Sequence, residues 1–150
     1  MLALFSACSS HTVQVSDRQV ESVPVNQGRD LGERAAGIAL QQVGVPYRYG
    51  GSSSSGFDCS GLVHFSYGKA GKSVPRTTGQ LWSSTSTIAR DELQMGDLLF
   101  FKINGKMSHV GVYVGGQRFV HAPSSGRTVS VESLTSPYYA SAMIRAGRPK

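Results

Sequence analysis

Apolar side chains recur at helical spacing after residue 30. The stripe that predicts one buried helix face consists of Leu31, Ala35, Ile38, Ala39 and Val43. Asp30 is the expected N-cap of this helix, and Gly44 and Pro46 are expected to end it.

Two further helices are expected before residue 83. Residues 46–58 are rich in Gly and Ser and predict an irregular loop. A helix follows over residues 59–70, with Asp58 as its N-cap. Its inward-facing side chains are expected to be Leu62, Val63 and Phe65. Residues 77–82 predict a short third helix.

The second half of the chain changes to the patterns of β-strands. Residues 97–103 form a mostly apolar run typical of a buried strand, and Asn104-Gly105 is a hairpin signal. Further strands are expected over residues 109–114, 118–121, 128–131 and 140–145. Helices followed by an antiparallel sheet predict an α+β fold.

The turn after residue 114 decides where two histidines point. A two-residue turn of Gly115 and Gly116 would place His109 and His121 on opposite faces of the sheet. A three-residue loop ending at Gln117 would put both imidazoles on one face, about 7–8 Å apart between backbones. We predict the three-residue loop, because it brings two groups with catalytic chemistry together. The opposite, core-facing side would then carry Val110, Val112 and Val120.

Composition limits the chain to one globular domain. The sequence has 150 residues, of which 39% are hydrophobic and 16% charged, and this excludes a coiled coil, a collagen-like repeat and a highly charged disordered chain. A net charge of +6 favours an anionic partner such as nucleic acid, an acidic membrane or a wall polymer. Nucleic acid gains no further support, because there is no dense Lys/Arg run and no zinc-ligand spacing.

The N-terminal residues predict a membrane anchor and a tether. Residues 1–8 end in Ser-Ala-Cys and resemble the tail of a bacterial lipoprotein signal, in which Cys8 is lipidated. No basic segment precedes them, so we expect the signal to begin before this sequence. Ser9 after the cysteine resembles outer-membrane sorting. Residues 9–28 predict a flexible tether, which leaves residues 29–150 as the domain.

Cys59 has the setting of a nucleophile. With Asp58 as N-cap, it sits in the first helical turn, where free N–H groups and the helix dipole favour a thiolate. Cysteines in such places have pKa values lowered from ~8.5 to about 3.5–7.5, and the thiolate is the attacking form. The small residues Ser60 and Gly61 would let a substrate backbone approach. A buried structural cysteine is the other interpretation of the same motif.

A nucleophilic cysteine needs a base, and the chain has four histidines. His11 lies in the expected tether, and His64 lies about 140° around the helix from Cys59. His109 is the expected base and His121 the group that orients it, provided that they share a face. Alternatively, zinc could be bound by three ligands, Cys59, His109 and His121. Such a site would require a fourth ligand or an open water position.

Six ordered segments resemble the NlpC-type cell-wall cysteine peptidases, a papain-like family. They are VGVPYRYGG (43–51), GFDCSG (56–61), VPRTT (74–78), GDLLFF (96–101), SHVGVYVG (108–115) and FVHAPSSG (119–126). The resemblance implies a papain-like α+β fold, with N-terminal helices packed on a small antiparallel sheet. It also implies a bacterial envelope hydrolase that cuts amide bonds in peptidoglycan stem peptides or cross-links, and no cofactor or metal is expected.

The resemblance assigns roles to the residues that match the family's motifs. The catalytic cysteine corresponds to Cys59, its base to His109 and the third polar residue to His121. The hydroxyl of Tyr47 would help to stabilise the oxyanion. The residues that flank the cysteine and would bind the peptide are Asp58 and Ser60.

Two arginines, Arg48 and Arg76, are candidates for contacts with carboxylates of the wall peptide. The scissile bond is expected beside diaminopimelate, either in D-glutamyl–diaminopimelate or in a diaminopimelate–D-Ala cross-bridge. The protein would then be a periplasmic enzyme, anchored by lipid to the outer membrane, whose partners are peptidoglycan peptides. The alternative is a wall-binding or regulatory lipoprotein whose triad is inactive.

Overall fold

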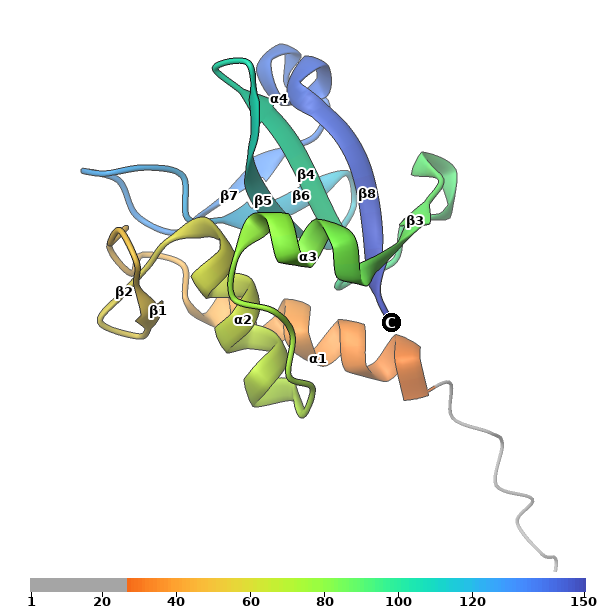
Figure 1. Cartoon of the computed structure of the whole chain (residues 1–150), viewed down its shortest axis with the longest axis horizontal. Helices are drawn as coiled ribbons and strands as arrows, with labels where there is room; N and C mark the ends of the chain where they lie inside the picture. Colours follow the sequence, from red (N-terminus) through yellow and green to blue (C-terminus); the bar gives the residue numbers. More distant parts are fainter. Residues whose placement is uncertain (1–26) are drawn as a thin grey trace, which may run out of the picture.

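The computed structural model describes residues 27–150 of the chain (Figure 1). The expected lipidation site, Cys8, and the rest of residues 1–26 lie outside the described residues. Helix α1 spans Gln27–Gln41, so residues 27 and 28 belong to the helix and not, as predicted, to the tether. Asp30 lies in the first turn rather than at the N-cap. A carboxylate interacts favourably with the helix dipole both at the N-cap and in the first turn. Asp30 therefore signals that a helix begins nearby but does not fix its first residue.

Helix α2 begins where its predicted cap places it, and α3 begins one residue later than predicted. α2 spans Cys59–Ala70, and the Asp58 carboxylate accepts a hydrogen bond from the N–H of Gly61 at 2.6 Å. α3 spans Thr78–Ser84 and is capped by Thr77. The loop before α2 is more regular than predicted, since it holds a small hairpin of β1 (Ser52–Ser53) and β2 (Gly56–Phe57).

Six strands form one antiparallel sheet in the order β3-β8-β4-β5-β6-β7. Three of them match predicted strands over most of their length: β4 (Leu98–Ile103), β5 (Lys106–Gly115) and β6 (Arg118–His121). A fourth, β7 (Ser130–Ser133), overlaps its predicted strand by two residues, and a fifth, β8 (Met143–Pro149), overlaps one in part. The sixth, β3 (Thr85–Ile88), was not predicted. A short helix, α4 (Pro137–Ala142), precedes β8, so the strand predicted over residues 140–145 is wrong for its first half. A turn of 3₁₀-helix over Arg90–Glu92 was also not predicted.

The register of β5 against β6 places both histidines on one face of the sheet. Val112 pairs with Val120, so the same register puts Gly111 opposite His121. Side chains two apart on a strand point to the same side, and His109 therefore shares a face with His121. This part of the sequence prediction is confirmed.

The predicted three-residue loop between β5 and β6 is nevertheless wrong. The register shifts between Tyr113 and Gly115, as at a β-bulge. A two-residue turn follows, formed by Gly116 and Gln117, both at a φ of 59°. One extra residue in the bulge changes the register by one, as a third loop residue would, so the faces are as predicted although the connection differs.

Helices α1, α2 and α3 lie together on one face of the sheet (Figure 1), and α4 packs through Tyr139 and Ala142 against the apolar side chains of the other face. The core beneath α1, α2 and α3 includes the predicted side chains Ala35, Ala39, Leu62, Val63, Val110, Val112 and Val120. A second apolar cluster on the opposite face comprises Leu99, Phe101, Tyr113, Phe119, Leu134 and Ala146. Val43 was expected in the helix stripe, but it lies beyond α1 and is 49% exposed.

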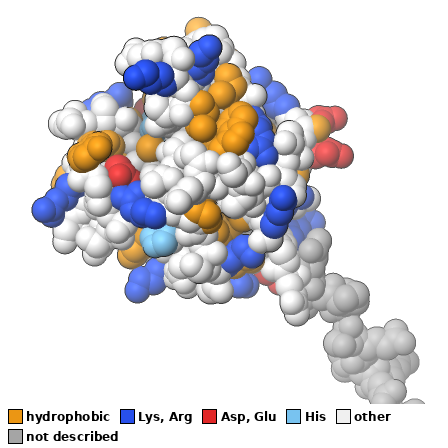
Figure 2. Space-filling model, in the orientation of Figure 1, with side chains coloured by type: hydrophobic (Ala, Val, Ile, Leu, Met, Phe, Trp, Pro, Cys, Tyr) orange, Lys and Arg blue, Asp and Glu red, His pale blue; other side chains and the backbone are white. Residues whose placement is uncertain are grey.

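The surface carries the positive charge that composition indicates. Figure 2 shows several Lys and Arg side chains and few Asp or Glu side chains on the face it presents. Among residues 27–150, every helix is too short or too polar to cross a bilayer.

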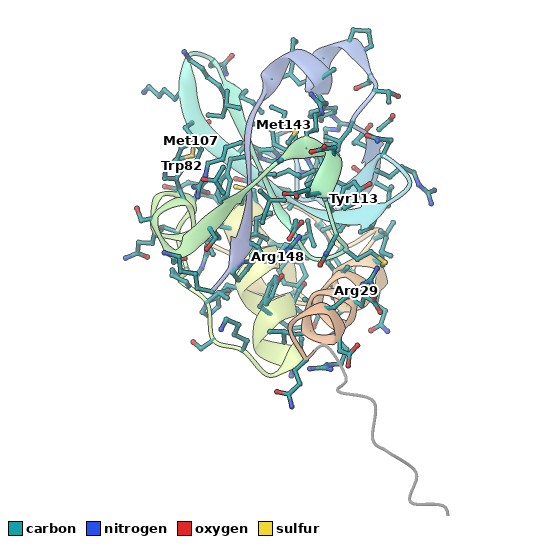
Figure 3. All side chains as sticks on the ribbon, turned by 90° about the vertical axis from the view of Figure 1, so that its right-hand side faces the viewer. Arg29, Trp82, Met107, Tyr113, Met143 and Arg148 are labelled. Atoms are coloured by element: carbon teal, nitrogen blue, oxygen red, sulfur yellow. The ribbon has the colours of Figure 1, made fainter. Side chains whose placement is uncertain are left out.

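An ion pair ties the end of β8 to the start of β4. The carboxylate of Asp97 is buried, and Arg148 of β8 (Figure 3) donates to it from Nε at 2.7 Å and from Nη2 at 2.9 Å. The only other donor to this carboxylate in the described chain is the N–H of Gln94, at 2.8 Å. A buried carboxylate that loses its cation keeps the full cost of leaving water.

We therefore predict that Arg148→Leu lowers the free energy of unfolding by about 2–3 kcal/mol. Urea denaturation of the variant and the native chain measures this difference. Arg90→Leu is the matched control, because Arg90 is exposed and in no ion pair of the described chain; it should change the value by less than about 0.5 kcal/mol. Equal effects of the two changes would contradict the assigned role of Arg148.

Candidate active site

The sulfur of Cys59 lies against the strand that carries the expected base. Cys59 is half-buried at the start of α2. Its Sγ is 3.8 Å from the carbonyl oxygen of Ser108 and also meets the backbone N–H of Val110. Because these residues flank His109 in β5, the fold brings the helix terminus and the histidine strand together, as predicted.

Thr78 is a contact of the sulfur that the sequence prediction missed. Its hydroxyl lies 3.7 Å from Cys59 Sγ, and it is the first residue of α3. The one sequence signal that could have found it is its place at the end of the VPRTT segment.

Burial controls the ionisation of Cys59 in the resting protein. It raises the pKa of the thiol above its ordinary value, and the nearby Asp58 carboxylate raises the pKa further. Hydrogen bonds from Thr78 and from the N–H groups of Val110 and Ser60 act in the opposite direction without reversing the shift. The lowered thiol pKa predicted from the helix terminus is thus contradicted, because removal of water disfavours the anion more strongly than these donors favour it.

The two strand histidines form a buried hydrogen-bonded pair. His109 Nε2 lies 2.7 Å from His121 Nδ1, and the side chains are buried, His121 being 1% exposed. Burial lowers the pKa of His109 to about 4. It also lowers the pKa of His121 to about 3, with additional effects from His109 and Arg127. Both rings are therefore neutral at pH 7.

No hydrogen bond joins Cys59 to either imidazole within residues 27–150. Since His109 Nε2 is occupied by His121, Nδ1 is the ring nitrogen of His109 that remains available to the sulfur. Catalytic hydrogen bonds are often long in the absence of substrate and tighten when it binds. The resting site is thus a neutral thiol beside a strand that carries a neutral imidazole.

Tyr47 lies close enough to the sulfur to be influenced by its charge. Burial raises the pKa of the Tyr47 phenol, and a charge on Cys59 raises it further. The residue is fixed through its backbone, whose N–H donates to the carbonyl of Arg127 at 2.9 Å. The phenol therefore keeps its proton at neutral pH and can act as a hydrogen-bond donor.

Asp58, Ser60 and Arg76, three of the four predicted substrate-binding residues, bind one another. Both terminal nitrogens of Arg76 donate to the Asp58 carboxylate at 2.9 Å. Arg76 also donates to the Ser60 hydroxyl at 2.9 Å and to the Gly51 carbonyl at 3.2 Å. The N–H of Gly50 completes the set by donating to Asp58 at 3.1 Å. This network holds the loop before α2 against the helix start that carries Cys59.

Gly61 has a structural role different from the one expected. A Cβ at this position would collide with the carbonyl oxygen of Gly51. The missing side chain therefore makes room for the loop rather than for a substrate backbone. The fourth predicted binding residue, Arg48, is exposed and forms no ion pair within the described residues.

The zinc alternative has no support in this geometry. The described part of the chain contains no group of three or more His, Cys, Asp or Glu side chains that could hold a metal ion. Nε2 of His109 and Nδ1 of His121 form a hydrogen bond with each other at 2.7 Å. A metal ion shared by the two rings would need these same two nitrogens.

The thiol assignment predicts how Cys59 reacts with an electrophile. In a Cys8→Ser background, the rate of alkylation by iodoacetamide should rise with pH. The pH at which this rate is half-maximal should be higher for Cys59 than for free cysteine, because burial disfavours the thiolate. Stopped time points analysed by mass spectrometry give the rate. Full reactivity already at pH 6 would contradict a neutral resting thiol.

The buried histidines predict a loss of stability in mild acid. Histidines of the unfolded chain take up protons near pH 6.5, whereas His109 stays neutral down to about pH 4. The unfolded state then binds more protons, so the free energy of unfolding should fall as pH drops from ~6.5 to ~4. Denaturation at several pH values measures this slope.

Two variants separate this effect from other titrations. His121→Asn removes one buried imidazole and should flatten the slope, whereas His64→Gln, on the partly exposed side of α2, should preserve it. A slope that is the same in all three proteins would exclude the histidine pair as its cause.

Comparison with known proteins identifies relatives of this chain. The profile of the NlpC/P60 family matches residues 44–148. Murein DD-endopeptidase MepH of Escherichia coli (strain K12) is 43% identical over 106 residues, which cover 67% of this chain and 39% of that protein. The bifunctional muramidase/DL-endopeptidase CwlT of Bacillus subtilis (strain 168) is 39% identical over 142 residues, or 92% of this chain and 42% of that protein. The chain thus spans about two fifths of these relatives.

Solved structures with the same arrangement belong to the same family. An NLP/P60 family protein from Staphylococcus aureus, described as similar to lipoprotein, superposes with a TM-score of 0.71 at 37% identity, covering 79% of this chain and 41% of that one. An NlpC/P60 family protein from Bacillus cereus gives a TM-score of 0.70 at 32% identity, covering 81% and 42%. The papain-like helix-on-sheet fold expected from the sequence is confirmed, and the chain belongs to the NlpC/P60 family.

Proposed function

We propose that this chain is a peptidoglycan endopeptidase in which Cys59 is the nucleophile and His109 the base. The observation that carries the proposal is the meeting of two elements: the start of α2 places the sulfur against β5, and His109 in that strand is hydrogen-bonded to the buried His121. The printed activities of the relatives, murein DD-endopeptidase and DL-endopeptidase, support the same reaction class.

The first chemical step moves one proton and forms one bond. The thiol proton of Cys59 passes to Nδ1 of His109 as the sulfur attacks the amide carbonyl, and the carbonyl electron pair moves to oxygen. The Tyr47 hydroxyl and the backbone N–H of Cys59 donate hydrogen bonds to this oxyanion, which is worth roughly 3–4 kcal/mol per donor in comparable sites. The Cys59 thiol and the His109 imidazole are both neutral before this step. The imidazolium and the oxyanion therefore form only when substrate is bound.

The second half of the reaction returns the enzyme to its resting state. The carbon–nitrogen bond breaks as the His109 proton passes to the leaving amine, which leaves a thioester on Cys59. Water then attacks the thioester with His109 as base, and the thiol regains its proton when the carbon–sulfur bond breaks.

The substrate proposed is an amide bond beside diaminopimelate in a stem peptide or cross-link. Arg48 is exposed near the loop that holds Tyr47, and its guanidinium is available to a peptide carboxylate. Arg76 is committed to Asp58 and Ser60, so we assign these three residues to holding the Cys59 helix terminus in place. A substrate ammonium would reach Asp58 only by joining this network.

We place the enzyme outside the cytoplasm, tethered to the outer membrane by lipid on Cys8. The support is the Ser-Ala-Cys sequence followed by Ser9, together with the envelope location implied by substrates made of peptidoglycan. The basic surface (Figure 2) suits a polymer that carries carboxylates.

Digestion of purified muropeptides tests the proposed function. The native protein should release a new free amine beside diaminopimelate, and mass spectrometry of the products identifies whether D-glutamyl–diaminopimelate or diaminopimelate–D-Ala is cut. Cys59→Ala should abolish cleavage, by at least about 10⁴-fold, because the nucleophile is lost. Thr135→Ala, a change at an exposed residue in the loop before α4, is the control that should retain activity.

Two outcomes would reject the proposal. Cleavage retained by Cys59→Ala would remove the cysteine from the mechanism. Absence of cleavage by the folded native protein, with binding to the muropeptides preserved, would favour the alternative of a wall-binding or regulatory module.

A further inference from the structure

One polar atom of the histidine pair has no hydrogen-bond partner. His121 is 1% exposed, and its Nε2 is buried without any acceptor or donor in contact. Buried polar atoms are satisfied in the great majority of cases, so such an exception calls for an explanation. Its surroundings are aromatic rather than polar.

Three rings surround the His121 imidazole. The Phe119 centroid lies 4.9 Å away with the planes at 67°, and the Tyr139 centroid lies 5.4 Å away with the planes at 85°. The third ring is that of His109, at 4.9 Å and 74°. Phe101 contacts both Phe119 and Tyr139, at centroid distances of 5.0 Å and 5.6 Å.

The short hydrogen bond between the histidines permits two proton arrangements. In the first, His109 donates from Nε2, so His121 carries its proton on the orphaned Nε2 and His109 has a free lone pair on Nδ1. In the second, His121 donates from Nδ1, so its Nε2 carries a lone pair and His109 has its proton on Nδ1. Only the first arrangement leaves His109 able to accept the proton of Cys59.

The aromatic rings distinguish between these arrangements. The face of an aromatic ring is negative and its edge positive. An N–H of His121 within the cluster is attracted by such faces, as in a weak N–H···π hydrogen bond, whereas a lone pair in the same place is repelled by them. Among the described residues, no side-chain or backbone donor lies within hydrogen-bond distance of this lone pair.

We propose that Phe119 and Tyr139 are positioning residues that fix the tautomer of the histidine pair, with the proton of His121 on Nε2. His109 then has a free lone pair on Nδ1, able to accept a proton, before substrate arrives. This inference rests on the proposed function for its consequence in catalysis, but the tautomer itself is a property of the resting protein.

The charged groups near the pair do not supply an alternative partner. Arg127 disfavours a positive charge on His121, and Arg127 and Glu132 influence the Tyr139 phenol in opposite directions. Arg127 and Glu132 are themselves paired at 3.7 Å. None of these groups makes a hydrogen bond with His121 Nε2.

Tyr139 is the member of the cluster that can be changed without emptying the core. It is half-exposed on α4, whereas Phe119 is fully buried. Tyr139→Phe keeps the ring and Tyr139→Leu removes it. Tyr138→Leu is the matched control, because Tyr138 contacts Tyr139 from the exposed side and makes no ring contact with His121.

Nuclear magnetic resonance of the ¹⁵N-labelled native protein at pH 7 reads the tautomer directly. Two-bond ¹H–¹⁵N correlations distinguish a protonated from an unprotonated ring nitrogen, and His64→Gln and His109→Gln assign the signals. We expect a protonated Nε2 and an unprotonated Nδ1 in His121. The opposite pattern in the native protein would overturn the proposal, with no variant required.

Activity on muropeptides provides the second readout. Tyr139→Leu should show a mixture of tautomers and lower kcat/KM by about three- to tenfold, while Tyr139→Phe and Tyr138→Leu stay within about twofold. An unchanged tautomer and unchanged kcat/KM in folded Tyr139→Leu would exclude Tyr139 from this role. Failure of the proposed function would instead appear as cleavage that survives Cys59→Ala. That outcome would not change the tautomer measured in the native protein.

Discussion

The hydrogen bond between His109 and His121 depends on one register of β5 against β6. A slip of one residue would turn every side chain of a strand to the other face, and the two imidazoles would then lie on opposite sides of the sheet. The bulge before Gly115 and the turn of Gly116 and Gln117 prevent this slip. The same register sends Val112 and Val120 into the core beneath the helices, so folding and the geometry of the site are set by the same strand pairing.

The site combines groups that would favour charge with an environment that opposes it. The start of α2, Thr78 and nearby N–H groups favour a thiolate on Cys59, but burial prevails and leaves the thiol neutral. The buried His109 is neutral as well. In the mechanism that we propose, transfer of a proton between them conserves net charge and becomes favourable when an oxyanion forms beside the Tyr47 hydroxyl. The proposed nucleophile would then stay protonated until a substrate is present.

Local signals in the sequence predicted the elements that carry Cys59, His109 and His121, and contacts between distant residues account for most of what was missed. Asp58 marked the start of α2 because its side chain caps the helix within three residues. The strand β3 lacks such a signal, since it is a polar edge strand defined by its pairing with β8. Helix α4 has one, Ser136 followed by Pro137 at the first helical position, but the prediction did not use it. The direction of the Cys59 pKa shift, the engagement of Asp58 by Arg76 and the rings around His121 all depend on residues far apart in the chain. Chemical reasoning found the correct face for His109 through the wrong loop, because a bulge and a longer turn have the same effect on register.

The most direct test of the central claim is to trap the covalent intermediate. Native protein mixed with a muropeptide and quenched in acid within the first turnovers should carry an added mass equal to the acyl part of the substrate, and peptide mapping should locate it on Cys59. The account predicts that this adduct decays as free product appears. Turnover without any adduct on Cys59, or with an adduct on another residue, would contradict it.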